Sequence, residues 1–125
     1  MTAKVLVVDD SKFVRSQVGR ALPAAAFVIV EAGDGMEALE KLAQHADVCL
    51  VVCDVNMPRM DGLQFLEALR KQPAWKTLPV VMCTTEAHPD MVTTAATFGA
   101  KGWIVKPFKP ETLLATVHKL LAGAA

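Results

Sequence analysis

The chain has 125 residues, of which 53% are hydrophobic, and this length is enough for one domain with a sizeable core, spanning residues 1–125. Its 13 Lys and Arg residues balance its 13 Asp and Glu residues, so the formal net charge of zero offers no basic surface for nucleic acid or an anionic membrane. Its apolar runs are all shorter than the ~20 residues that a membrane-spanning helix needs, which argues against a membrane protein.

Short apolar runs rich in β-branched residues alternate with segments of helical period along the chain. In chain order the predicted elements are strand 4–8, helix 12–22, strand 27–30, helix 36–46, strand 48–53, helix 63–71, strand 79–83, helix 91–98, strand 103–105 and helix 111–121. The strand segments are continuously apolar rather than alternating, which is typical of a parallel sheet covered on both faces. Five strands alternating with five helices predict a doubly wound α/β domain.

The second predicted strand is followed by Glu31 and can lie at an edge of the sheet, and polar residues also follow the other four predicted strands. They are Asp9 and Asp10 after the first strand, Asp54 after the third, Thr84 and Thr85 after the fourth, and Lys106 and Pro107 after the fifth. Ligands of doubly wound sheets bind outside the carboxyl ends of the strands. We therefore expect three acids, hydroxyl groups and a lysine to meet at one rim.

Three carboxylates at one rim repel one another unless a cation lies among them. Mg²⁺ prefers oxygen ligands, keeps several waters, and suits a site with carboxylates but no Cys or His at ligand spacing. Its open positions commonly take a phosphate, whose remaining oxygens Lys106 and a Thr hydroxyl could hold. A carboxylate in such a site can attack phosphorus and form an aspartyl phosphate.

Four segments together resemble the receiver domain of two-component response regulators, in particular the stand-alone chemotaxis-type (CheY-like) regulators. They are VLVVDDS, VVCDVNMPRMDG, VVMCTTEA and KGWIVKPF, which occur in the family's order and spacing and span essentially the whole chain. The resemblance implies a five-stranded parallel sheet with the flavodoxin-like strand order 2-1-3-4-5.

The resemblance also assigns roles to the acids. It implies that Asp54 accepts a phosphoryl group from a histidine kinase. It implies that Asp10 and Asp54 bind Mg²⁺ together with the backbone carbonyl of Asn56, whereas Asp9 acts largely through a metal-bound water.

The remaining implied roles concern the response to phosphorylation. Thr84 would be the switch hydroxyl and Lys106 the phosphate-binding lysine, with a cis peptide bond between Lys106 and Pro107. Trp103 stands where the family usually carries a Tyr or Phe that changes rotamer on activation. The altered surface of the fourth helix, fifth strand and fifth helix would then control binding of a downstream protein target.

The implied protein is a cytoplasmic signalling switch rather than an enzyme with turnover, although it would hydrolyse its own phosphoryl bond. Asn56 and Glu86 would flank the path of the attacking water. The three cysteines, Cys49, Cys53 and Cys83, lie in apolar runs and indicate reduced thiols, which suits the cytoplasm.

Other interpretations remain open on the residues alone. Asp10 or Ser11 could simply cap the first helix. A dinucleotide-binding domain shares the fold, but VVDDSKFVR has no glycine-rich turn. A phosphatase of the haloacid dehalogenase type would carry an Asp where Asn56 stands. A phosphorylation-independent receiver-like module would lack some of the acids that this chain has.

Overall fold

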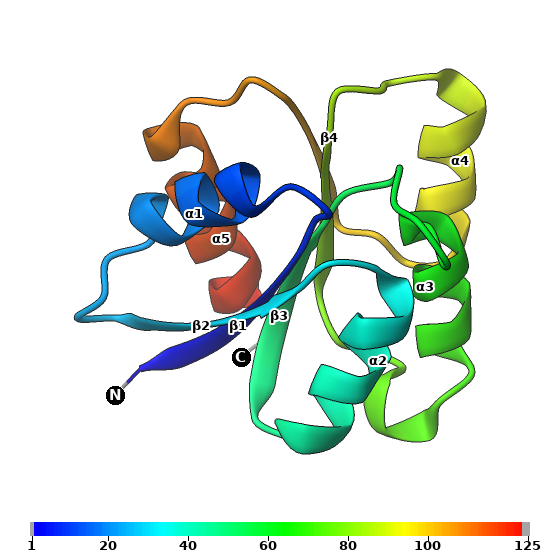
Figure 1. Ribbon diagram of the computed structural model, residues 1–125, viewed down its shortest axis with the longest axis horizontal. Coiled ribbons are helices and arrows are strands. Elements are labelled where there is room, and N and C mark those ends of the chain that lie inside the picture. The colour runs from blue at the N-terminus through cyan, green and yellow to red at the C-terminus, as the bar shows by residue number, and fades with distance from the viewer. Residues whose placement is uncertain (1, 124–125) are drawn as a thin grey trace.

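Five parallel strands form one sheet in a computed structural model that describes residues 2–123. The strands are β1 (Ala3–Val8), β2 (Phe27–Ala32), β3 (Val48–Cys53), β4 (Val80–Thr84) and β5 (Gly102–Val105). Their order in the sheet is β2-β1-β3-β4-β5, so the chain reverses its direction of winding after β2 (Figure 1). The predicted fold class and strand order are confirmed.

Helices cover both faces of this sheet. They are α1 (Lys12–Ala21), α2 (Gly35–Gln44), α3 (Gly62–Arg70), α4 (Pro89–Thr97) and α5 (Pro110–Gly123), with a short 3₁₀ helix, η1 (Pro73–Trp75), between α3 and β4. In Figure 1, α1 and α5 lie on one face, and α2, α3 and α4 lie on the other. Among the described residues, none of these helices combines the length and the apolar character needed to cross a lipid bilayer.

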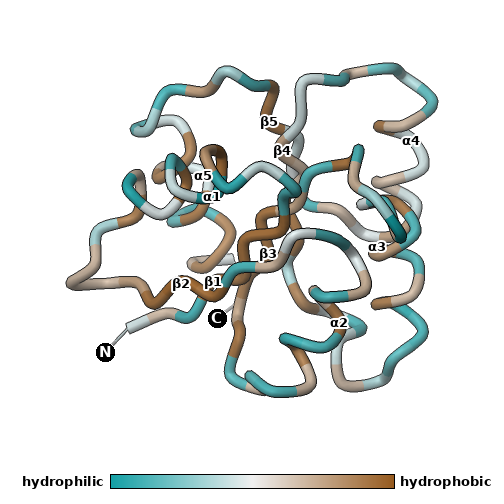
Figure 2. Tube along the Cα trace, viewed as in Figure 1, coloured by the Kyte–Doolittle hydropathy of each residue, from teal (hydrophilic) through white to brown (hydrophobic). Residues whose placement is uncertain are grey.

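Each strand contributes to two separate cores. In β1, Val5 and Val7 pack with the side chains of α1 and α5, whereas Leu6 and Val8 pack with those of α2 and α3. Successive side chains of a strand point to opposite faces, so a strand covered on both sides must be apolar at every position. Figure 2 shows this as hydrophobic colour along β3 and along most of β1. Each fully buried Val or Leu contributes about 1.5–3 kcal/mol through its removal from water.

Side-chain caps determine where three of the helices begin. Ser11 accepts a hydrogen bond from the backbone N–H of Val14 at the start of α1, and Asp34 caps α2 in the same manner. Asp61 and Gln64 form a reciprocal capping box at the start of α3. The cap of α1 is therefore Ser11 and not Asp10, which leaves the Asp10 carboxylate available to the strand-end rim.

Candidate functional site

The predicted site residues meet at the carboxyl ends of β1, β3, β4 and β5, which we call the strand-end rim. Val8 of β1 is paired with Cys53 of β3, so the residues that follow, Asp9 and Asp54, leave the sheet side by side. The backbone N–H of Asp54 donates to the carbonyl of Val8 over 2.9 Å, which extends the pairing to the site itself.

Three acids form a compact group at this rim, the acid cluster of Asp9, Asp10 and Asp54. Each offers a carboxylate oxygen, and these oxygens lie within 4.8 Å of one another. Asp9 and Asp54 are buried, with 3% and 7% of their surface exposed, whereas Asp10 is exposed. The clustering that the strand ends predicted is confirmed.

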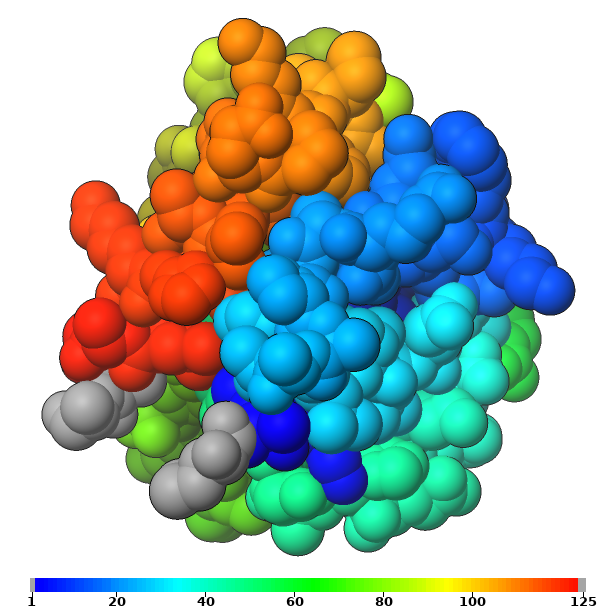
Figure 3. All heavy atoms as spheres, turned by 90° about the vertical axis from the view of Figure 1, so that its left-hand side faces the viewer, coloured from blue at the N-terminus to red at the C-terminus, as the bar shows by residue number. Residues whose placement is uncertain are grey.

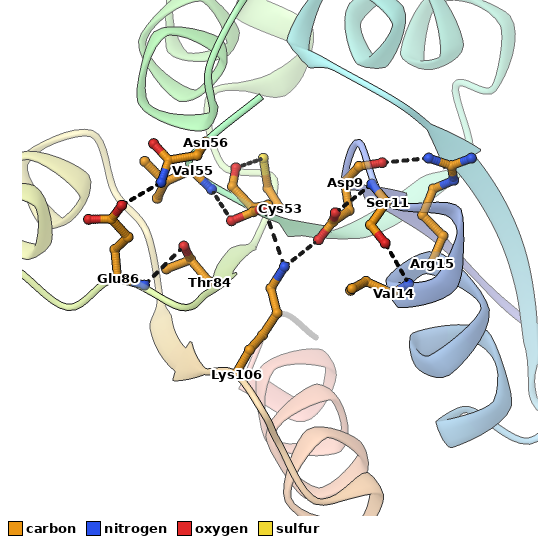
Figure 4. A network of polar contacts seen from close by, with 11 residues as sticks. Asp9, Ser11, Val14, Arg15, Cys53, Val55, Asn56, Thr84, Glu86 and Lys106 are labelled. Carbon is orange, nitrogen blue, oxygen red and sulfur yellow. Dashed lines mark hydrogen bonds and ion pairs between the residues drawn. The ribbon is translucent and has the colours of Figure 1, made fainter. Parts of the chain in front are cut away.

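Lys106 reaches into the acid cluster from the end of β5 (Figure 4). Its Nζ lies 2.6 Å from Asp9 Oδ2 and 3.2 Å from Asp54 Oδ2. Burial by itself would lower the pKa of Lys106, but the hydrogen bond and charge of Asp9, joined by Asp54, raise it above its ordinary value. Lys106 is therefore fixed in the site by two ion pairs and is not a solvated surface lysine.

Burial dominates the electrostatics of Asp9. It raises the pKa of that carboxyl above its ordinary value, although Lys106 and the backbone N–H of Ser11 act in the opposite direction. Two buried carboxylates sharing one ammonium carry more negative charge than that ammonium neutralises. A rim of this kind gains from binding a further cation.

The donor set fits Mg²⁺. All three side chains of the acid cluster offer hard oxygen ligands, and the exposed carboxylate of Asp10 leaves the group open to solvent on one side. The side-chain amide of Asn56 donates to Glu86 Oε1 over 2.6 Å. The backbone carbonyl of Asn56 is the further oxygen ligand that the resemblance implies.

Asp54 is held on both sides of its carboxylate. Oδ1 accepts from the backbone N–H of Val55 over 2.7 Å, and Oδ2 faces Lys106. Its backbone is packed against α3, because a Cβ atom at Gly62 would lie 2.0 Å from the Asp54 carbonyl oxygen. The position of the carboxylate therefore depends on a glycine eight residues later, which residue type alone did not indicate.

Glu86 joins the predicted switch residues to one another. Its backbone N–H donates to Thr84 Oγ1 over 3.3 Å, and its carbonyl accepts from Trp103 Nε1 over 2.9 Å. Its carboxylate contacts Asn56 through one oxygen and His88 Nε2 through the other. Thr84 and Trp103 are thus connected through a residue that the sequence indicated only as a flank of the water path.

Two further expectations are confirmed. The Lys106–Pro107 peptide bond is cis. The three cysteines are free, and burial raises the pKa of the Cys83 thiol to about 12 and that of Cys53 well above its ordinary value. Both thiols therefore stay protonated and act as small core groups.

Comparison with known proteins gives matches that span most of the chain. A model of the response regulator receiver domain matches residues 5–118. Chemotaxis protein CheY1 of Helicobacter pylori is 40% identical over 111 residues, which are 88% of this chain and 90% of CheY1. The structure of chemotaxis protein CheY4 of Vibrio cholerae matches with a TM-score of 0.88 and 44% identity, covering 95% of this chain and 98% of that one.

A third match is a structure solved with ligands. A chain of the CheX–CheY–BeF3–Mg²⁺ complex of Borrelia burgdorferi matches with a TM-score of 0.87 and 32% identity, covering 94% of this chain and 88% of that one. Family model, relatives and fold agree over nearly the whole sequence. The chain therefore belongs to the response regulator receiver domain family, as a CheY-like receiver of two-component signalling.

Proposed function

We propose that residues 1–125 form a single receiver domain in which Asp54 accepts a phosphoryl group from a histidine kinase, with Mg²⁺ as cofactor. The observation that carries this proposal is the setting of Asp54. Its carboxylate is held by Val55 and Lys106 within an acid cluster whose oxygens are spaced to hold a cation. Support also comes from the Borrelia burgdorferi relative, whose complex contains BeF3 and Mg²⁺.

The chain's own residues carry out the transfer. A carboxylate oxygen of Asp54 attacks phosphorus, the new O–P bond forms as the bond to the donor nitrogen breaks, and the released imidazole keeps the electron pair and takes up a proton. Lys106 turns its ammonium toward the phosphoryl oxygens and stabilises their charge. Mg²⁺, held by Asp10, Asp54 and the Asn56 carbonyl, with Asp9 acting through water, would neutralise charge on the acids and on the phosphoryl group.

The phosphoryl group then changes the hydrogen-bond partner of the Thr84 hydroxyl. It adds about −1.5 to −2 charges beside a fully buried hydroxyl, which is drawn away from the Glu86 N–H and toward the new oxygens. Glu86 also holds the Trp103 indole, so a shift of the segment after β4 reaches β5. We propose that the α4–β5–α5 face changes in this way and controls binding of a downstream protein target.

This face carries a shallow hollow that suits a protein partner. Its volume is about 240 Å³, and it is lined by Val92, Ala95, Ala96, Ala100, Lys101, Gly102 and Trp103. The lining is mainly apolar, with one cation.

Because histidine kinases transfer phosphoryl groups inside the cell and the thiols are free, we place the protein in the cytoplasm.

Incubation with acetyl phosphate and Mg²⁺ tests the proposed function. We expect one phosphoryl group per chain and decay of the label after the donor is removed, with Asn56 and Glu86 flanking the path of the attacking water. Steady hydrolysis of many phosphate esters would instead indicate a phosphatase. A protein that takes up no label would be a binding module without phosphorylation.

Mg²⁺ binding should depend more on Asp10 than on Asp9. Both Asp9 oxygens already accept hydrogen bonds, one from the Ser11 N–H and one from Lys106, whereas Asp10 is exposed. We expect Asp9→Ala to weaken Mg²⁺ binding about tenfold, as for groups that act through an outer shell, and Asp10→Ala to weaken it further. Calorimetric titration measures this, with the exposed Asp90→Ala as control. Equal losses would mean that both carboxylates are direct ligands.

Trp103 should report activation. When Thr84 moves, the Glu86 carbonyl that holds the indole moves with its segment, and the solvent contact of the ring changes. Trp75 belongs to η1, which precedes β4 and so lies toward the opposite end of the sheet. With BeF3 and Mg²⁺, we expect the emission of Trp75→Phe to change and that of Trp103→Phe to stay nearly constant. A response that follows Trp75 would exclude the aromatic part of the switch.

A further inference from the structure

Arg15 of α1 makes two strong contacts at the edge of the strand-end rim. Its Nη1 donates to the backbone carbonyl of Asp9 over 2.6 Å, and its Nε donates to Glu31 Oε1 over 2.8 Å. The Arg15 side chain is only 18% exposed, although it carries a charge. It therefore connects α1, the segment after β1 and the end of β2. Figure 3 shows the surfaces of α1 and β2 in this region, next to α5.

The segment that Arg15 contacts is the one that carries two members of the acid cluster. Within it, the Ser11 N–H donates to Asp9 Oδ1 over 2.9 Å, and Ser11 Oγ caps α1 (Figure 4). Asp10 lies between these two residues and its side chain is exposed. The backbone position of Asp10 is therefore fixed by the contacts on either side of it, and Arg15 holds that backbone at the Asp9 carbonyl.

We propose that Arg15 is a positioning residue for Mg²⁺ binding: through the Asp9 carbonyl it orients the acid pair Asp9–Asp10, while Glu31 keeps its guanidinium in place. The inference rests on the proposed magnesium site and adds to it a residue that touches neither the metal nor the phosphoryl group. Groups that orient metal ligands typically change metal affinity about 10–100-fold when they are removed.

The charge of Arg15 and its positioning role affect the affinity for Mg²⁺ in opposite directions, which makes the inference testable. Removing a positive charge near three carboxylates would by itself strengthen the binding of a cation. Removing the group that orients Asp9 and Asp10 would weaken it. The sign of the change in Mg²⁺ affinity therefore separates the two roles.

Mg²⁺ titration of the whole chain, followed by calorimetry, tests the inference. We expect Arg15→Met to weaken Mg²⁺ binding about tenfold, against the direction of the charge change. Arg15→Lys keeps the charge but has no fork to bridge the Asp9 carbonyl and Glu31, so we expect a smaller loss in the same direction. The exposed Arg20→Met removes the same charge from the same helix and should leave the affinity within about twofold of the unchanged protein.

Thermal unfolding of each variant shows whether it is folded at the titration temperature. Mg²⁺ affinity that is unchanged or higher in folded Arg15→Met or Arg15→Lys would overturn the positioning role, as would an equal loss in Arg20→Met. If Arg15→Met does not fold, Arg15→Lys decides by itself. Failure of the unchanged protein to bind Mg²⁺ would instead refute the proposed magnesium site, so the two failures are distinguishable.

Discussion

Replacing Asp54 by Asn is expected to abolish labelling by acetyl phosphate while leaving the fold intact. The Asn amide has the shape of the carboxylate, and its oxygen can still accept from the Val55 N–H. It cannot form an acyl phosphate, because its nitrogen is not a nucleophile toward phosphorus and its oxygen carries no full charge. Labelling is measured as phosphate per chain by intact-protein mass, and the fold by circular dichroism.

The matched control is Asp90→Asn, which makes the same chemical change at an exposed position in the first turn of α4. This variant should take up label at the unchanged rate. Labelling of Asp54→Asn at the level of the unchanged protein would remove Asp54 from the role of acceptor. Loss of label in both variants would show that the loss is not specific to position 54 and would not identify Asp54 as the acceptor.

Gly62→Ala is expected to have the second large effect, on stability and on labelling together. The added Cβ would lie 2.0 Å from the carbonyl oxygen of Asp54 and 3.0 Å from Cα of Val55, and these backbone atoms cannot move without moving the acceptor. We expect a loss of about 1–3 kcal/mol in the free energy of unfolding, as for overpacking of a close contact. Labelling should slow even where the protein is fully folded, because the Asp54 carboxylate is displaced from Lys106.

Gly19→Ala is the control for this change. Gly19 lies in the last turn of α1, and a Cβ there meets no atom of the described residues within 4 Å apart from the backbone of its own helix. Ala is a better helix former than Gly, so this variant should be more stable by about 0.5–1 kcal/mol and should label normally. Urea unfolding measures both variants. Normal labelling of folded Gly62→Ala would mean that the close approach does not position the acceptor.

The sequence predicted the strands and the acid cluster for a common physical reason, whereas the order of the strands came from the resemblance to the receiver family. Strands buried on both faces must be apolar throughout, so the first polar residue after each run marks the strand end and falls on the rim. Boundaries were less accurate where a strand lies at an edge. β2 continues through Glu31 and Ala32, whereas the prediction stopped at residue 30, because the polar side chain of Glu31 is exposed there and breaks the apolar run.

Contacts between side chains and backbone groups were not predictable from the sequence. Arg15 binds the Asp9 carbonyl, and Arg70 donates to the carbonyls of Trp75, Phe98 and Gly99. Every residue has a backbone carbonyl, so the sequence does not indicate which carbonyl accepts the hydrogen bond from a given arginine. The 3₁₀ helix η1, which contains Trp75, was not predicted either, because three residues are too few to show a helical period.

Charged contacts across the fold were predictable only where strand ends brought them together. Lys106 and Asp9 are 97 positions apart, yet both follow a strand, and their meeting at the rim was expected. Arg59 and Asp34 follow no such rule. Their ion pair of 3.0 Å is made by an Arg59 with a φ of 64°, a left-handed backbone conformation that is uncommon for residues other than glycine. The local sequence MPRMDG did not indicate this backbone conformation of Arg59.

Chemical mapping of the phosphorylated residue is the most direct measurement of the central claim. The chain is labelled with acetyl phosphate and Mg²⁺, the acyl phosphate is reduced with borohydride, and the peptides are sequenced by mass spectrometry. We predict homoserine at position 54, because reduction converts an aspartyl phosphate, and not a free carboxylate, into that alcohol. Stoichiometric phosphate on a serine, threonine or histidine, or homoserine at another aspartate with Asp54 unmodified, would contradict the account.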